Sequence, residues 1–162
     1  MKIGTTIVID RVDDVVKSVR ALGTQRTLVG IPSSTAGRRD VPITNAAIGY
    51  IHEFGAPEEN IPPRPFLIPG VASAMDRIRK MLGTAARQAV SGNRQALDRA
   101  LHAIGLVAVS AVRKKITDGP FAPLAESTLA SRRARGVTRT KPLIDTGQLR
   151  QGITYVIRRR GK

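Results

Sequence analysis

Two long stretches of helical periodicity in the middle of the chain, flanked by alternating apolar residues near both ends, restrict the fold more than any other feature. Apolar residues recur every three or four positions from about Pro69 to Ser91 and from about Asn93 to Thr117, which predicts two long amphipathic helices. Alternation with a period of two at 3–9 and 153–158 predicts a strand near each end. The chain is therefore expected to be an α+β domain, with an antiparallel sheet packed on one face by the two long helices.

Shorter predicted elements connect these four. Apolar spacing indicates a helix at about 11–23, a strand at 27–31, a helix at Asn45–Phe54 that ends at Gly55, and a short basic helix at about 126–135. A length of 162 residues suits one compact core. We therefore expect a single α+β domain that covers residues 1–162 and includes the basic segment 132–162.

The composition excludes several kinds of site. The chain has no cysteine, so disulfides, cysteine-ligated metals and a thiol nucleophile are excluded. Its longest nearly unbroken apolar run, 103–112, is about half of what a bilayer-spanning helix needs. The N-terminal apolar run contains Asp10 and lacks a small-residue cleavage site, so it is expected to belong to the fold. No membrane partner is predicted.

The charge is strongly positive and concentrated near the C-terminus. Lys and Arg number 27 against 12 Asp and Glu, which gives a net charge of +15, and the segment 132–162 has ten basic residues and a single acid, Asp145. A solvated basic face and a contact with a polyanion both fit this distribution. Stacking on bases is disfavoured, because the chain has three Phe, two Tyr and no Trp. The candidates for contact with DNA or an acidic partner are Arg132, Arg133, Arg135, Arg158, Arg159 and Arg160.

No catalytic, metal or cofactor motif is complete. His52-Glu53 matches the start of a zinc-protease helix, but position 56 is Ala where that motif needs a second His. A surface or capping role for His52 is expected instead. The adjacent Glu58 and Glu59 lie in a loop beside prolines and are expected to be solvated. Serine-hydrolase, Walker and dinucleotide-binding signatures are missing, so we predict no enzyme activity, metal site or cofactor.

Four blocks follow one another in a fixed order along the sequence. The blocks are Ala46-Ala47-Ile48-Gly49-Tyr50-Ile51-His52-Glu53-Phe54-Gly55, Ile61-Pro62-Pro63-Arg64-Pro65-Phe66-Leu67, Pro123-Leu124-Ala125-Glu126-Ser127-Thr128, and Lys141-Pro142-Leu143-Ile144-Asp145-Thr146-Gly147-Gln148-Leu149-Arg150-Gln151-Gly152-Ile153. Together they resemble the neck or tail-completion proteins of tailed bacteriophages, related sequences of which are also called virion morphogenesis proteins. The match runs from about Asn45 to Val156 and departs at Gly152, where the family often has Ser.

The resemblance implies a non-enzymatic structural subunit of the virion. It would form a homo-oligomeric ring, six-fold like the tail tube, at the head–tail junction and help to join a finished tail to a filled head. Its neighbours would be phage neck and tail-tube proteins, with contact to packaged DNA, and assembly would take place in the host cytoplasm. A tail terminator or another minor tail assembly protein remains an alternative, as does a free basic nucleic-acid-binding protein.

The proline-rich block and the last block each have a physical interpretation. Three prolines hold 61–66 in an extended conformation, so the segment is either an arm that contacts a neighbouring subunit with Phe66 as its anchor, or a strut that places Phe66 in its own core. Asp145-Thr146-Gly147 is interpreted as an architectural turn before the final strand. The interface candidates are Pro62, Pro63, Arg64, Pro65 and Phe66.

Overall fold

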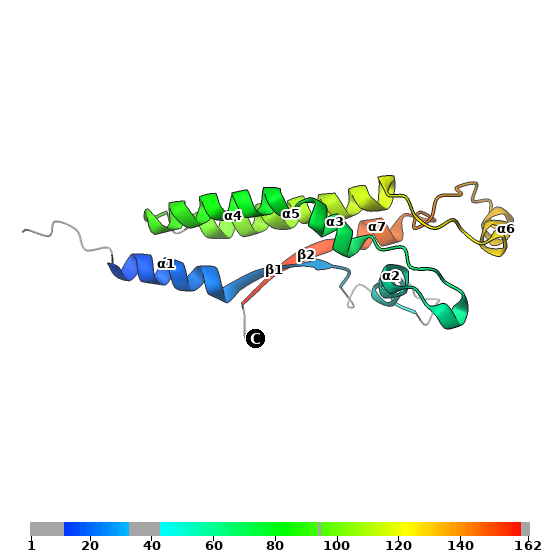
Figure 1. Cartoon of the computed structure of the whole chain (residues 1–162), viewed down its shortest axis with the longest axis horizontal. Coiled ribbons are helices and arrows are strands. Elements are labelled where there is room, and N and C mark those ends of the chain that lie inside the picture. Colours follow the sequence, from blue (N-terminus) through cyan, green and yellow to red (C-terminus); the bar gives the residue numbers. More distant parts are fainter. Residues whose placement is uncertain (1–11, 33–42, 94, 160–162) are drawn as a thin grey trace, which may run out of the picture.

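The structure, a computed structural model, describes residues 12–32, 43–93 and 95–159. The molecule is elongated, with α4 and α5 side by side along its length, the two strands beneath them and the short helices α2 and α6 at one end (Figure 1). In chain order the elements are α1 (Val12–Thr24), β1 (Gln25–Gly30), α2 (Asn45–Phe54), the 3₁₀ turn η1 (Pro57–Glu59), α3 (Leu67–Ser73), α4 (Met75–Val90), α5 (Gln95–Asp118), α6 (Glu126–Ala134), α7 (Gln148–Gly152) and β2 (Thr154–Arg159).

Helix α5 is the centre of the core and contacts α3, α4, β1 and β2. Val109, Val112 and Ile116 on its buried face pack with Phe66 and Ile153 in the main hydrophobic cluster. By length and by a mean hydropathy of 1.2, α5 passes the test for a membrane-spanning helix, but 44% of the tested window is buried inside the protein. That burial and its packing on four elements are typical of a core helix.

The two described strands form an antiparallel pair that α5 covers on one face. The register places Thr27 opposite Ile157 and Leu28 opposite Val156, and the hydroxyl of Thr27 donates to the Leu101 carbonyl on α5 at 3.3 Å. Alternate residues of each strand are more exposed, as expected for a sheet with one covered face. The predicted α+β class is confirmed. Of the two long helices expected on the sheet, α5 packs on both strands, whereas α4 packs mainly on α5 and α1. The predicted strand at 3–9 lies outside the described residues.

Two predicted elements differ from the structure. The helix expected from Pro69 to Ser91 begins at Leu67 and is divided at Ala74, whose φ of −99° and ψ of −1° separate α3 from α4. The earlier start has a structural reason, because the side chain of Glu53 accepts the first amides of α3. Helix α7 lies between the predicted turn at 145–147 and the predicted strand at 153–158, where no element is predicted.

A close approach between α5 and β2 depends on Gly105. A Cβ built on Gly105 would lie 2.2 Å from the ring of Tyr155, whereas a Cβ on Gly83 in α4 would have its nearest contact at 3.8 Å, with the Arg87 side chain. Gly105→Ala is therefore expected to lower the free energy of unfolding by about 1–2 kcal/mol, because the overlap outweighs the gain in helix propensity. Gly83→Ala should instead raise it by up to about 1 kcal/mol. Urea unfolding of both variants tests this, and equal effects would contradict the close packing.

Candidate functional site

Glu53 is buried at the end of α2 and holds the start of α3. Its Oε2 accepts hydrogen bonds from the amides of Phe66 and Leu67 at 2.8 Å each, and its Oε1 accepts one from the amide of Ile68 at 2.9 Å. These amides lie at the N-terminus of a helix, where backbone donors lack intrahelical partners and a negative charge is favoured. The carboxylate therefore fixes the first residues of α3 against α2, a tie between two of the sequence blocks.

Arg64 joins the proline-rich block to the segment before α6. Its guanidinium is buried and donates to the carbonyls of Ala122 at 2.8 Å and Pro123 at 2.7 Å, while its backbone amide donates to the His52 carbonyl at 2.7 Å. Three chain segments are thereby held together by one residue. Hydrogen bonds from a charged donor to carbonyls in a buried site are stronger than those between neutral groups.

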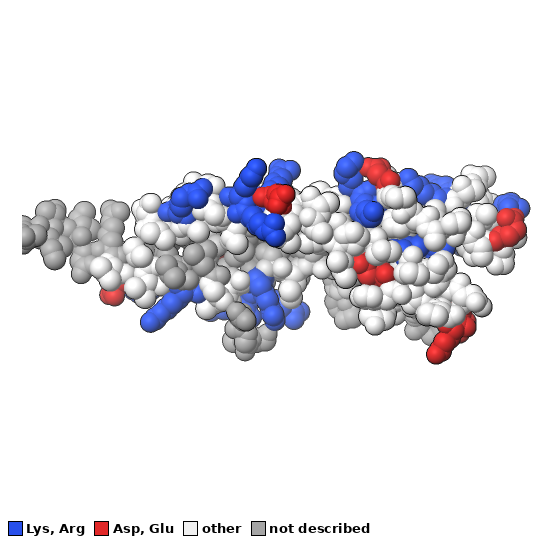
Figure 2. Space-filling model, in the orientation of Figure 1, with Lys and Arg blue, Asp and Glu red and all other residues white. Residues whose placement is uncertain are grey.

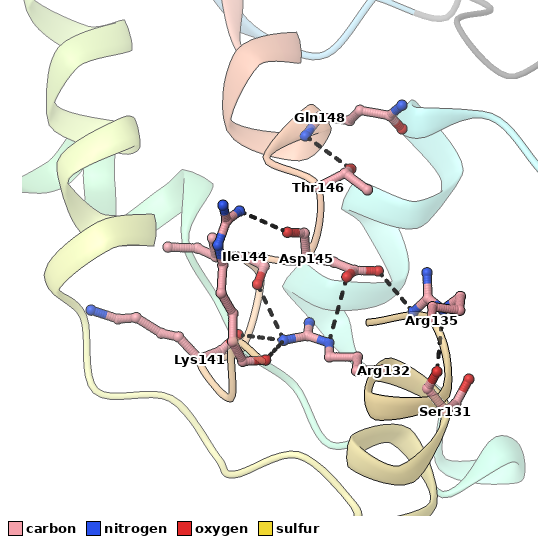
Figure 3. A network of polar contacts seen from close by, with 9 residues as sticks. Ser131, Arg132, Arg135, Lys141, Ile144, Asp145, Thr146 and Gln148 are labelled. Atoms are coloured by element: carbon pink, nitrogen blue, oxygen red, sulfur yellow. Dashed lines mark hydrogen bonds and ion pairs between the residues drawn. The ribbon is translucent and has the colours of Figure 1, made fainter. Parts of the chain in front are cut away.

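Arg132 is at the centre of a network of polar contacts (Figure 3). The residue is 5% exposed, and its Nη1 donates to the carbonyls of Arg139, Lys141 and Ile144 at 2.9–3.1 Å. Asp145 lies beside it, with Oδ1 at 3.8 Å from Nε of Arg132 and Oδ2 at 3.1 Å from Nη2 of Arg135. One guanidinium thus organises the loop between α6 and the D-T-G turn.

Three residues between α6 and α7 have positive φ: Gly136, Leu143 and Gly147. Leu143 has φ of 63°, which is unusual for a bulky side chain, and its side chain is buried in the main core cluster. Gly147 has φ of 86° at the start of α7. Thr146 accepts the Gln148 amide through its hydroxyl at 3.4 Å. Asp145-Thr146-Gly147 therefore leads into α7 and not directly into the final strand as the sequence predicted. Its architectural role stays a prediction.

A hollow of about 260 Å³ lies between α2, α6 and the D-T-G turn, and His52 and Asp145 are among the residues that line it. Within the described chain, the buried His52 Nδ1 and Asp145 Oδ1 have no hydrogen-bond partner. Burial lowers the pKa of His52 below its usual 6.5, and the positive charges of Arg64 and Arg132 lower it further. His52 is thus held neutral, which fits neither the surface nor the capping role expected for it.

The depressed pKa of His52 predicts acid sensitivity. The unfolded chain takes up a proton on this residue near pH 6.5, whereas the folded protein does so only at lower pH. The contribution of His52 to the free energy of unfolding is therefore fully present above about pH 6.5. It is lost as the pH falls from there toward the lower pKa of the folded state, by at most about 1.4 kcal/mol per pH unit. His52→Gln is expected to reduce this loss, measured by urea unfolding at about pH 7.5 and about pH 5. An identical pH dependence in the variant would contradict the assignment.

The proline-rich block divides between interior and surface. Phe66 is 1% exposed and belongs to the core cluster, so the strut interpretation applies to it and its role as an anchor on a neighbour is corrected. Arg64 is likewise buried by its internal contacts. Pro62, Pro63 and Pro65 are exposed and remain candidates for contact with a partner.

The basic candidates are also divided. Arg132 is buried in its network and is not available to DNA, because the charge is already enclosed by carbonyls and Asp145. Arg133 pairs with Glu126 and Arg135 with Asp145, both at the surface. Arg158 and Arg159 are exposed on β2, and Arg160 lies outside the described residues. Only part of the predicted basic surface is therefore accessible.

A wider basic hollow of about 470 Å³, which the sequence did not indicate, lies between α5 and α7. Arg113, on α5, lines it and donates to the carbonyls of Arg150 at 3.1 Å, Gln151 at 3.3 Å and Ile153 at 2.9 Å. Lys114 and Asp118, beside it, form an ion pair at 2.6 Å. Arg113 thus ties α7 and the start of β2 to the central helix, so its charge also serves the fold.

The buried Glu53 and Arg64 are the internal ties that sequence reasoning missed. A signal was present for Glu53, which is the one acid in the mostly apolar helix Asn45–Phe54. Within the described ranges, no group of three or more His, Cys, Asp or Glu is placed to hold a metal ion.

Comparisons of the chain with protein-family models, curated proteins and solved structures find no match.

Proposed function

We propose that the chain is a structural subunit of a tailed-phage virion, a tail-completion or neck protein that forms a ring at the head–tail junction and helps to join the tail to the head. The observation that carries this proposal is the convergence of the four sequence blocks. Glu53 ties the first block to the second, Arg64 ties the second to the third, and Arg132 in α6 ties the loop after α6 to the fourth. The order of motifs that resembles the family is thus also one physical unit.

The chemistry of that unit fits a structural role. Its buried charged groups bind backbone amides and carbonyls of the same chain, whereas catalytic groups need to face a substrate. Burying a charged group lowers the stability of the fold unless hydrogen bonds or an opposite charge satisfy it. A buried group that is fully hydrogen-bonded holds its partners in a defined geometry. A subunit that must present fixed surfaces to several neighbours benefits from such rigidity. We propose no catalytic activity.

Exposed apolar side chains also favour a subunit of an assembly. Tyr50 and Phe54 on α2 are 67% and 55% exposed, and their rings contact each other at an interplanar angle of 48° with centroids 4.8 Å apart. Single exposed apolar residues are ordinary on a monomer, but a paired aromatic surface is typical of a protein contact. This observation serves a neck subunit and a tail terminator equally.

Light scattering on nuclease-treated protein, followed by negative-stain imaging, tests the proposal. We expect a closed ring of about six copies, since heterologous contacts that close generate rings. Tails and filled heads from a phage that lacks the chain should join when the purified protein is added. A different outcome is a protein that stays monomeric, does not join heads to tails and, after nuclease treatment, still binds DNA in a salt-sensitive way. That outcome would instead indicate a free nucleic-acid-binding protein. Gold labelling of virions separates the neck from the end of the tail tube.

A further inference from the structure

The outer face of the sheet carries two like charges directly opposite each other. Arg26 on β1 pairs in register with Arg158 on β2, and both side chains are exposed. Opposed like charges on one face of an antiparallel pair are destabilising. Within the described residues, neither arginine makes an ion pair. The arrangement is therefore costly for the isolated chain and suits an anionic partner.

Next to the two arginines the same face is apolar. Leu28 and Val156 are the next cross-strand pair on it, 39% and 41% exposed. A hollow of about 190 Å³ is lined by these two residues together with Arg158 and the residues at 29–32, 154 and 155. This outer sheet face, defined by Arg26, Leu28, Val156 and Arg158, thus combines a small apolar depression with a pair of cations.

A second surface of the chain has the complementary chemistry. Glu58 and Glu59 are exposed in η1, and neither forms an ion pair with a described residue. An antiparallel bridge between Ala56 and Ile61 holds this turn directly after α2. Three residues separate Glu58 from Phe54, the exposed partner of Tyr50. We call Tyr50, Phe54, Glu58 and Glu59 the acidic corner.

The two surfaces lie at different places along the elongated molecule. The acidic corner belongs to the end that holds α2, whereas the strand ends that carry Arg26 and Arg158 lie toward α1 (Figure 1). Figure 2 shows acidic atoms at the lower edge of the α2 end and basic atoms below the opposite half. One molecule therefore presents both halves of a charge-complementary contact in different regions, which favours contact between copies over contact within one.

We propose that the acidic corner of one copy docks on the outer sheet face of the next, with an aromatic side chain of Tyr50 or Phe54 in the hollow and Glu58 and Glu59 against Arg26 and Arg158. The contact is heterologous, so its repetition generates a ring if the rotation closes. It rests on the proposed function, for which it names the partner surface. A DNA backbone is the weaker occupant, because phosphates supply no partner for Leu28 and Val156.

Reversal of charge on each surface tests the contact. Arg26→Glu with Arg158→Glu makes both surfaces acidic, and Glu58→Arg with Glu59→Arg makes both basic. Each double variant is expected to raise the apparent dissociation constant for self-association by roughly tenfold or more in about 0.1 M salt. An equimolar mixture of the two should associate again, because each surface of one variant then meets the opposite charge on the other. That recovery also shows that both variants are folded.

A control variant with the same change in net charge accompanies the charge-reversal experiment. Arg77→Glu with Lys80→Glu changes the net charge as the first variant does, at exposed positions of α4, and should leave association unchanged. Wild-type association that survives both reversals, or a mixture that stays dissociated while wild type associates, overturns the contact alone. Wild type that remains monomeric at every concentration overturns the contact and also removes the ring from the proposed function. Loss of DNA binding with unchanged association would assign the arginine pair to DNA instead.

Discussion

Arg132→Met is expected to lower the free energy of unfolding by about 3–5 kcal/mol. The substitution removes the buried donor for the carbonyls of Arg139, Lys141 and Ile144 and leaves Asp145 without its buried partner. Methionine fills much of the arginine volume, so the loss reports the missing polar contacts rather than a cavity. Guanidinium chloride unfolding followed by circular dichroism measures it.

Arg135→Met is the matched control for this variant. Arg135 pairs with the same Asp145, but its side chain is half exposed, and exposed ion pairs contribute at most about 1 kcal/mol. A difference of at least about 2 kcal/mol between the two variants is therefore expected. Equal effects would mean that the loop after α6 does not depend on the buried guanidinium.

Glu53→Ala is expected to cost about 3–5 kcal/mol and to loosen the start of α3. The side chain accepts three backbone amides, and its loss leaves donors without partners at a helix N-terminus inside the protein. Hydrogen exchange at the amides of 66–68 should accelerate more than exchange in the middle of α5, because the loss is local. Unfolding in urea gives the free energy.

Two variants define what the carboxylate contributes. Glu53→Gln keeps one acceptor oxygen and the shape of the side chain but loses the charge, so it should fall between wild type and Glu53→Ala. Glu59→Ala removes an exposed carboxylate and should change stability by less than about 0.5 kcal/mol. If Glu53→Gln is as stable as wild type, the hydrogen bonds of the side chain hold the start of α3 and its negative charge contributes nothing.

The two structural ties make residues of different sequence blocks depend on one another. A change at Glu53 or Arg64 removes a partner from another block, and the unpartnered group then stays buried at a cost. The charge-reversal variants test association separately from stability. Their substitutions lie in the acidic corner and on the outer sheet face, and both surfaces are outside these buried networks.

Local chemistry was sufficient to predict most of the secondary structure. The helix at Asn45–Phe54 was predicted with its observed bounds, and the predictions for the helices at 93–117 and 126–135 and the strand at 153–158 each lie within about two residues of α5, α6 and β2. These elements have clear apolar periodicity, and caps or breakers mark their ends. The α+β class followed from their order along the chain.

The roles of the charged residues could be assigned only from the tertiary structure. Arg132 and Arg158 have the same side chain and both lie in a basic segment, yet the first is enclosed by three carbonyls and the second faces solvent on the sheet. The break at Ala74 and the early start of α3 likewise depend on contacts between distant segments. Periodicity and composition determine which elements form, because these are local properties. Burial and hydrogen-bond partners arise from long-range packing, and they decide which charged side chains support the fold and which remain exposed to solvent.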